Sequence, residues 1–227
     1  MELSDAGNMA SQIDAEIQAL PVCNTAAARA IRRQYSRKLK PVDPTFVFEL
    51  AKALIEKYDQ RWLAYELIRH HPATFQQLGA AELAELGQGI DSWDTVDAFA
   101  RILAGPAWLK GQLSDEVIRA WAGSEDLWWR RAALVSTVAL NMRSQGGRGD
   151  VARTLAICEM LAADHEDMVA KAMSWALRAL VGHDPEAVEA FLIEHEADLP
   201  ARVKREVRNK LTTGLKNPKR KTRGDRS

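Results

Sequence analysis

An indole and a carboxylate lie four positions apart in residues 89–103, which read GIDSWDTVDAFARIL. If this stretch is a helix, Trp93 and Asp97 share one face and contact each other, at the edge of an apolar stripe with core spacing. Asp97 is not expected to cap the helix, because Ser92 already stands at the capping position. A carboxylate beside an electron-rich ring can stabilise a positive charge that develops during a reaction. The alternative for Asp97 is an ordinary surface ion pair with Arg101, four residues on.

A second tryptophan lies between two cations in residues 166–181. One side of the predicted helix is apolar and consists of Val169, Ala172, Met173, Ala176, Leu177 and Leu180. Trp175 falls nearly opposite, together with Lys171 and Arg178. A buried tryptophan would be the ordinary expectation, but the helical phase turns this one away from the core. The arrangement suits a nucleic-acid surface, where the ring packs on a sugar or base and the cations bind phosphate.

An arginine lies among apolar positions in residues 126–140, which read DLWWRRAALVSTVAL. The helical phase places Arg131 on the apolar side and Arg130 away from it. A partly buried guanidinium needs an anionic partner, because an uncompensated buried charge is costly. The partner is either Asp97 or a DNA phosphate, and both readings stay open.

The order of three motifs, SWDTVD, then LWWRRAA, then KAMSWALR, resembles the DNA alkylation repair glycosylases of the AlkD-like family. The resemblance covers residues 89 to about 216, and the first half departs from the family's pattern. It implies HEAT-like helical repeats and excision of cationic alkylated purines from duplex DNA, without a cofactor. By motif match, Asp97 would be the catalytic carboxylate and Trp93 and Trp175 would flank the deoxyribose. Arg131 and Arg178 would hold phosphates around the lesion.

The residue types in these motifs agree with that chemistry. The cluster offers a single carboxylate, whereas ordinary glycosidases need two, one of which protonates the leaving group. A single carboxylate suffices when the leaving group already carries a positive charge, as an N3- or N7-alkylated purine does. What remains is to stabilise an oxocarbenium-like sugar and to position water, which Asp97 and two indole faces can do.

The formal net charge of zero conceals a segregated charge distribution. Residues 201–227 contain eleven Lys and Arg against two Asp and Glu, so residues 1–200 carry a net charge of −9. Residues 24–40 contain no acid, and on the helix predicted there Arg29, Arg33 and Arg37 line one face. That face is either solvated or in contact with phosphates. Segregated charge of this kind favours a surface that binds a polyanion such as double-stranded DNA.

Nearly every segment predicts helix, with Pro and Gly at intervals of about 10–20 residues and no convincing strand pattern. About a dozen amphipathic helices with short connections favour antiparallel pairs. The predicted fold is therefore all-α, an α-solenoid of antiparallel helix pairs (HEAT-like repeats) with a concave DNA-binding face. We expect one helical-repeat domain over residues 1–215 and a basic, disordered tail over residues 216–227. The Gly105-Pro106 pair predicts a turn that ends the helix of residues 89–103.

Several other classes of protein are disfavoured by the sequence. No apolar run approaches the length of a membrane span, and the N-terminus shows no secretory signal. Cys23 and Cys158 are far apart and the five histidines form no ligand pattern, so we expect no zinc and a reducing compartment. A cytoplasmic monomer is the expectation. Two alternatives to a glycosylase remain, namely a non-catalytic helical-repeat protein that binds duplex or branched DNA, and a protein-binding helical scaffold.

Overall fold

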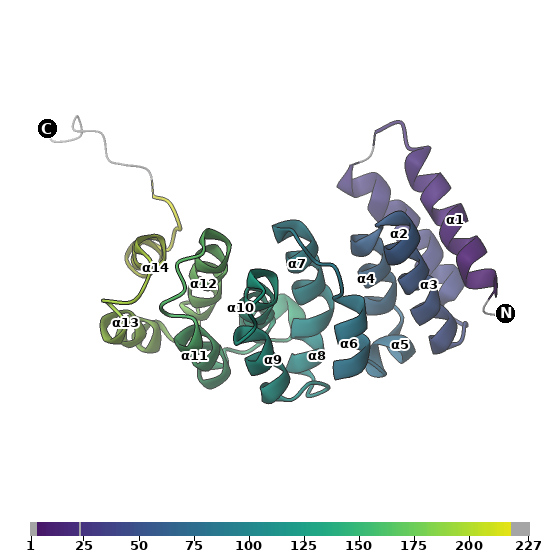
Figure 1. The fold of residues 1–227 in the computed structure, drawn as a ribbon. Helices are drawn as coiled ribbons and strands as arrows, with labels where there is room; N and C mark the ends of the chain where they lie inside the picture. Colours follow the sequence, from purple (N-terminus) through teal and green to yellow (C-terminus); the bar gives the residue numbers. More distant parts are fainter. Residues whose placement is uncertain (1–3, 23, 219–227) are drawn as a thin grey trace, which may run out of the picture. The chain divides into compact units, whose positions relative to one another are not determined.

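The computed structural model describes residues 4–22 and 24–218, and every regular element in these ranges is a helix (Figure 1). This confirms the predicted all-α fold built from helical repeats. The chain divides into two compact units, Met1–Val117 (unit 1) and Ile118–Ser227 (unit 2), within the helix α9 (Asp115–Ala122). The single domain over residues 1–215 stays a prediction.

Unit 1 contains the helices that precede α9. They are α1 (Ser4–Gln18), α2 (Thr25–Leu39), α3 (Pro44–Tyr58), α4 (Arg61–Arg69), α5 (Pro72–Gln76), α6 (Ala80–Leu86), α7 (Trp93–Phe99), the π-helical η1 (Ala100–Ala104) and α8 (Gly105–Leu109). The long helices α1, α3 and α4 pack in succession, and α4 also contacts α2 and α7. Its core is therefore built around α3 and α4.

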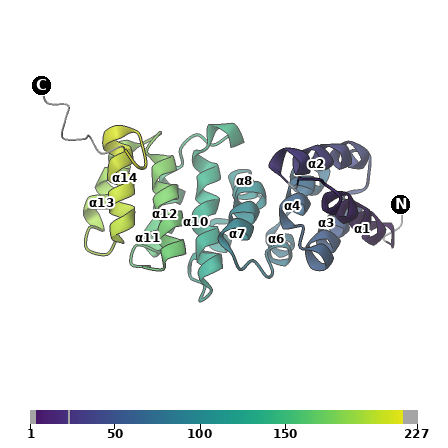
Figure 2. The ribbon, with the colours of Figure 1, turned by 90° about the horizontal axis from the view of Figure 1, so that it is seen from above.

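Unit 2 contains the helices that follow α9. They are α10 (Leu127–Asn141), the short 3₁₀ helix η2 (Arg143–Gln145), α11 (Val151–Met160), α12 (Asp167–Leu180), α13 (Pro185–Glu194) and α14 (Ala201–Thr213). The second helices of successive pairs, α10, α12 and α14, lie side by side (Figure 2). The central helix α12 thus has a packed neighbour on each side.

Local capping explains where many of these helices begin. A side-chain oxygen accepts a hydrogen bond from a backbone N–H of the first turn at Asn24, Asp43, Asp126, Asp150 and Asp184. Such caps satisfy donors that have no partner inside the helix. The helix predicted within residues 24–40 is confirmed as α2, and its buried stripe consists of Ile31, Tyr35 and Leu39.

The turn predicted at Gly105-Pro106 is wrong. The chain passes from α7 through η1 into α8 without leaving helical conformation, and the Gly105 N–H bonds to the carbonyl of Ala100, five residues back. In a π-helical turn an N–H bonds to the carbonyl five residues back instead of four. Pro106 follows directly, in the first turn of α8, where the missing proline N–H is tolerated. The proline is thus accommodated inside a continuous helical segment.

Cys158 is fully buried, whereas Cys23 lies outside the described residues. Most of the tail expected over residues 216–227 also lies outside them, from residue 219 onward. Within the described ranges, no helix has both the length and the apolar character needed to cross a membrane.

Candidate functional site

Trp93 and Asp97 both lie on α7, as predicted. The residues that were expected at core spacing, Val96, Phe99, Ala100 and Leu103, are all completely buried. Trp93 keeps 57 % of its surface exposed, and Asp97 is half-buried. The helix therefore presents a solvent-facing indole and a partly shielded carboxylate one turn apart.

The start of α7 is fixed by its own cap. The Ser92 and Thr95 hydroxyl oxygens lie 2.8 Å apart, and Thr95 also accepts a hydrogen bond from the Ser92 N–H at 3.3 Å. Asp97 is thus not the capping residue, in agreement with the prediction. After Phe99 the backbone leaves α-helical geometry, and the ion pair of Asp97 with Arg101 stays a prediction.

The helix α4 supports α7 from the core side of unit 1. The buried ring of Tyr65 packs edge-on against Phe99, with 5.8 Å between ring centroids, and its hydroxyl donates to the Leu86 carbonyl at 2.9 Å. Arg61 Nη2 donates to the Gly89 carbonyl at 3.1 Å, just before α7 begins. Burial raises the pKa of Tyr65, so its hydroxyl stays protonated and keeps donating. These contacts hold α7 and the preceding loop in a defined position.

The helix α12 carries the second tryptophan and its two cations. All six residues predicted on its apolar side are buried, whereas Lys171, Trp175 and Arg178 keep part of their surface exposed. Lys171 Nζ lies 2.7 Å from Asp167 Oδ2, one turn earlier on the same helix. The prediction that Lys171, Trp175 and Arg178 do not belong to the buried side of α12 is confirmed.

Arg178 is connected to a buried carboxylate through a hydroxyl. Its Nε donates to Ser174 Oγ at 3.1 Å, and that hydroxyl donates to Glu206 Oε2 on α14 at 2.6 Å. Burial lowers the pKa of Arg178, and the charge of Glu206 opposes this effect. The arginine is therefore connected to α14, and the residue keeps part of its surface exposed.

Arg131 is more deeply buried than the sequence suggested. Only 5 % of its surface is exposed, and its Nη1 donates to the backbone carbonyl of Met168 at the start of α12. The neighbouring Arg130 turns the other way and pairs with Asp164 at 2.7 Å. Arg130 thus connects α10 to the loop before α12, and Arg131 connects it to the first turn of α12.

The helix α2 presents the other predicted cations. Arg29, Arg33 and Arg37 are exposed on one face, whereas Tyr35 on the opposite face donates to Glu16 Oε1 of α1 at 2.7 Å. These three arginines form a solvent-facing row, called here the α2 row. Its exposure is compatible with both earlier readings, a solvated face and phosphate contact.

The predicted site residues are thus distributed over both units. Unit 1 holds Trp93 and Asp97 on one helix, and it also holds the α2 row. Unit 2 brings Arg131 into contact with the start of α12, the helix that carries Lys171, Trp175 and Arg178. A joint site formed by Asp97 and Trp175 stays a prediction.

Two residues that hold the candidate site in place, Tyr65 and Glu206, were not predicted from the sequence. Tyr65 looked like an ordinary core residue, and Glu206 looked like one acid in a basic helix. The signal for Glu206 was present, because it is the only acid between residues 201 and 216. Among the described residues, no group of three or more His, Cys, Asp or Glu side chains is placed to hold a metal ion.

The family model for DNA alkylation repair enzymes matches residues 3–211 of this chain. The chain belongs to the DNA alkylation repair enzyme family. This confirms the resemblance seen in the three motifs. It also extends that resemblance, because the family match includes the first half of the chain, which had departed from the expected pattern.

A solved structure shows the same fold as this family member. It is a protein from Enterococcus faecalis described as a predicted DNA alkylation repair enzyme, with a TM-score of 0.66 and 19 % identity. The alignment covers 92 % of this chain and 96 % of that protein. A search of the curated proteins found no match. The structural likeness supports the fold, and the family match supports a role in the repair of alkylated DNA.

Proposed function

We propose that this chain is a DNA glycosylase that excises cationic N3- and N7-alkylated purines from duplex DNA. In this proposal Asp97 is the catalytic carboxylate, and Trp93 and Trp175 flank the deoxyribose of the damaged nucleotide. Lys171, Arg178 and the α2 row supply cations for the DNA, whereas the buried Arg131, predicted as a phosphate contact, holds the start of α12 in place. A cytoplasmic location and a monomeric state are part of the same proposal.

One observation carries the proposal, namely the pairing of an exposed indole and a half-buried carboxylate on α7. A tryptophan with 57 % of its surface exposed is unusual in a folded domain unless the ring contacts a partner. One helical turn away, Asp97 offers a negative charge in surroundings shielded from bulk water, where electrostatic stabilisation is stronger. A cationic sugar next to the indole would lie within reach of both groups.

The reaction balances with a single carboxylate. The N-glycosidic bond breaks, its electron pair goes to the alkylated purine, and the purine leaves as a neutral base. The positive charge passes to the deoxyribose, where Asp97 and the indole faces stabilise the oxocarbenium-like transition state. A water oxygen then bonds to C1′ and releases a proton, which leaves an abasic site. No proton donor is needed for the leaving group.

The test is release of N7-methylguanine and N3-methyladenine from methylated duplex DNA. We expect Asp97→Asn to lower the rate of release by at least about 100-fold, as expected when a transition-state charge loses its partner. Binding to the same duplex should persist. Asp94→Asn is the matched control, because Asp94 is exposed on the first turn of the same helix. This control should release both bases at the wild-type rate.

Two outcomes would contradict the proposal. Unimpaired release by Asp97→Asn would remove Asp97 from the mechanism. No release by the wild-type protein, with duplex binding intact, would support the non-catalytic DNA-binding alternative, for which the exposed α2 row is the structural basis.

A further inference from the structure

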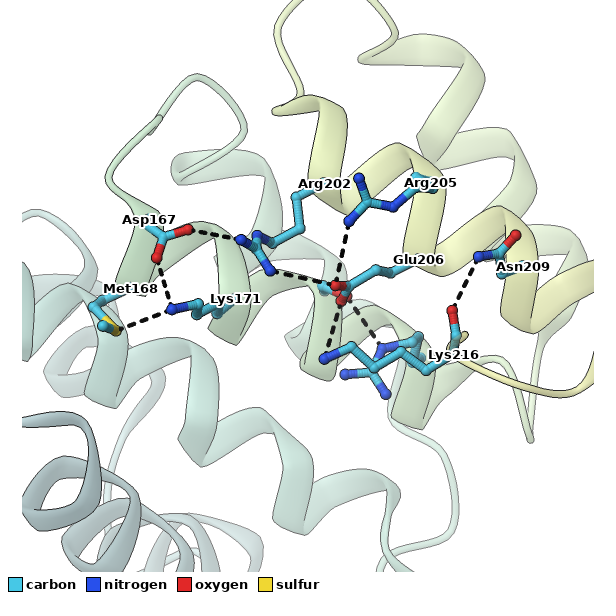
Figure 3. Close-up of polar contacts among 10 residues, drawn as sticks. Asp167, Met168, Lys171, Arg202, Arg205, Glu206, Asn209 and Lys216 are labelled. Carbon is cyan, nitrogen blue, oxygen red and sulfur yellow. Dashed lines mark hydrogen bonds and ion pairs between the residues drawn. The ribbon is translucent and has the colours of Figure 1, made fainter. Parts of the chain in front are cut away.

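A buried carboxylate lies beneath a group of cations on α14. Glu206 is 2 % exposed, and its Oε2 accepts the hydrogen bond from Ser174 of α12 (Figure 3). Burial alone would raise the pKa of Glu206, but the Ser174 hydrogen bond and the charges of Lys216 and Arg178 outweigh it and lower the pKa. The side chain is therefore ionised at neutral pH.

Three cations surround this carboxylate within 4 Å. Lys216 Nζ lies 3.4 Å from Glu206 Oε2, and Arg202 Nη1 and Arg205 Nη2 lie 3.6 Å and 3.8 Å from Oε1. Figure 3 shows the three side chains converging on Glu206. We call Glu206, Ser174, Arg178, Arg202, Arg205 and Lys216 the Glu206 cluster. Each of the three cations has more N–H donors than its contacts with carboxylates use, so donors stay available for other acceptors.

The backbone after α14 is shaped so that Lys216 returns to the helix. Gly214 adopts a left-handed conformation with φ of 72°, which reverses the chain at the end of α14. Asn209 then donates to the Lys216 carbonyl at 3.0 Å. The lysine is thus held over the cluster by a built turn.

The cations are exposed although the carboxylate is not. The side chains of Arg202, Lys216 and Arg205 are 37 %, 43 % and 62 % exposed, against 3 % for Glu206. Lys171, which pairs with Asp167, adds a further cation. Arg202 also contacts Asp167, with 3.2 Å between Arg202 Nη2 and Asp167 Oδ1. Lys171 and the four cations of the cluster face two carboxylates, so this surface carries a net charge of +3.

A second group of charges on α14 is organised differently. Glu196, which is half exposed, pairs with Lys204 at 3.6 Å and with Arg208. Two cations there share an accessible carboxylate, whereas in the Glu206 cluster the carboxylate is buried and the cations are outermost. The same helix therefore offers both a candidate anion-binding residue, Arg205, and a matched control, Arg208.

We propose that the Glu206 cluster binds the phosphate backbone of duplex DNA, with buried Glu206 as the positioning residue that gathers Arg202, Arg205 and Lys216. This deepens the proposed function, since it rests on DNA as the substrate. A duplex fits better than a single phosphate, because the cations come from α12, α14 and the turn after it. Axes of packed helices are about 8–10 Å apart, a distance over which a duplex presents several phosphates.

The experiment measures the affinity of the full chain for an undamaged duplex over a range of salt concentrations. We expect Arg205→Gln to weaken binding about fivefold near 0.15 M salt and to lower the slope of log K against log salt by about 0.9, because one phosphate contact is lost. Arg208→Gln removes the same charge from the same helix and should leave the slope unchanged. Equal losses in both variants would overturn the proposal, since they would reflect net charge alone.

Glu206→Gln separates positioning from simple charge. The substitution removes one negative charge and so raises the net charge of the protein by one. If the carboxylate merely repelled DNA, its removal would give tighter binding. A positioning role instead predicts weaker binding, and tighter binding would overturn it. Circular dichroism checks whether each variant keeps its helical content. If Glu206→Gln unfolds, Arg205→Gln still tests the site.

The undamaged duplex and a second polyanion show whether the measured effect is specific to DNA binding. Because the duplex carries no alkylated base, the binding result does not depend on whether the chain excises bases, and failure of either proposal can be recognised. Vesicles of phosphatidylserine and phosphatidylcholine provide the second polyanion. If Arg205→Gln weakened vesicle binding and left duplex binding unchanged, the assignment to DNA would be wrong.

Discussion

The surroundings of two carboxylates, Asp97 and Glu206, suit them to different tasks. Asp97 is half-buried one turn from the exposed ring of Trp93, so it can meet a charge that arrives with a substrate. Glu206 is covered by cations of its own chain and accepts a hydrogen bond from buried Ser174. Removing the charge of Asp97 should therefore affect chemistry, whereas removing that of Glu206 should affect stability and binding.

The stability of the protein should depend on the ionisation of Glu206. Its pKa in the folded state lies below the ordinary value of 4.5, so its contribution to the free energy of unfolding is complete above about pH 5 and is lost as pH falls through the folded pKa. Glu206→Gln should lower the free energy of unfolding by about 1–3 kcal/mol at pH 7, since it removes a charged acceptor from a buried hydrogen bond. The variant should also lose less stability on acidification. Urea unfolding of the wild type and of Glu206→Gln at pH 7 and near pH 3.5 measures these free energies of unfolding. If the two proteins lost the same free energy of unfolding between these pH values, the prediction would be wrong.

At the scale of elements, the helices that carry function are held by contacts of two kinds. The start of α2 depends on a local cap, in which the Ala27 N–H donates to Asn24 Oδ1 at 3.0 Å. The position of α7 depends on distant residues, because Tyr65 of α4 packs on Phe99 and bonds to Leu86. Local caps can be recognised in a sequence, whereas such distant contacts cannot.

The cap of α2 gives a prediction at this scale. Asn24→Ala should lower the free energy of unfolding by about 1 kcal/mol, because one N–H of the first turn loses its acceptor. Thr25→Ala changes the next exposed residue and should stay within about 0.5 kcal/mol of the wild type. Thermal or urea unfolding followed by circular dichroism distinguishes them. Similar stabilities for the two variants would show that the cap does not stabilise α2.

At the scale of the whole molecule, cations suited to DNA occur in both units. The α2 row lies in unit 1, and the Glu206 cluster lies in unit 2. A protein that searches for a rare lesion gains from sequence-independent contacts with phosphates, and their number is measurable from the salt dependence of binding. Our proposals imply that one duplex contacts cations from both units.

This implication can be tested with one variant in each unit. Arg33→Gln and Arg205→Gln should each lower the salt slope by about 0.9, and the double variant should lower it by about 1.8, because each removes one contact with the same duplex. Binding titrations with a single duplex at several salt concentrations provide the slopes. If the double variant matched either single variant, only one of the two surfaces would bind DNA. Arg208→Gln again serves as the charge-matched control.

Much of the fold and part of the candidate site followed from the sequence. The cap at Ser92, the buried stripe of α12 and the placement of Trp93 and Asp97 on one helix were all predicted. Each depends on residues within about four positions of one another, and the physics of caps and amphipathic faces acts over that range. For this reason a single sequence was enough to predict them.

Tertiary structure decided the remaining features. The hydrogen bond between Ser174 and Glu206 joins residues 32 positions apart, and the bond from Arg131 to Met168 joins residues 37 positions apart. The sequence predicted a turn at Pro106, but the chain continues through η1 into α8 as one helical segment, and η1 packs against α4. The sequence alone determined which residues could meet on one helix. Only the packing of helices determined which carboxylate became buried beneath cations, because burial and charge pairing depend on neighbours that are distant in the chain.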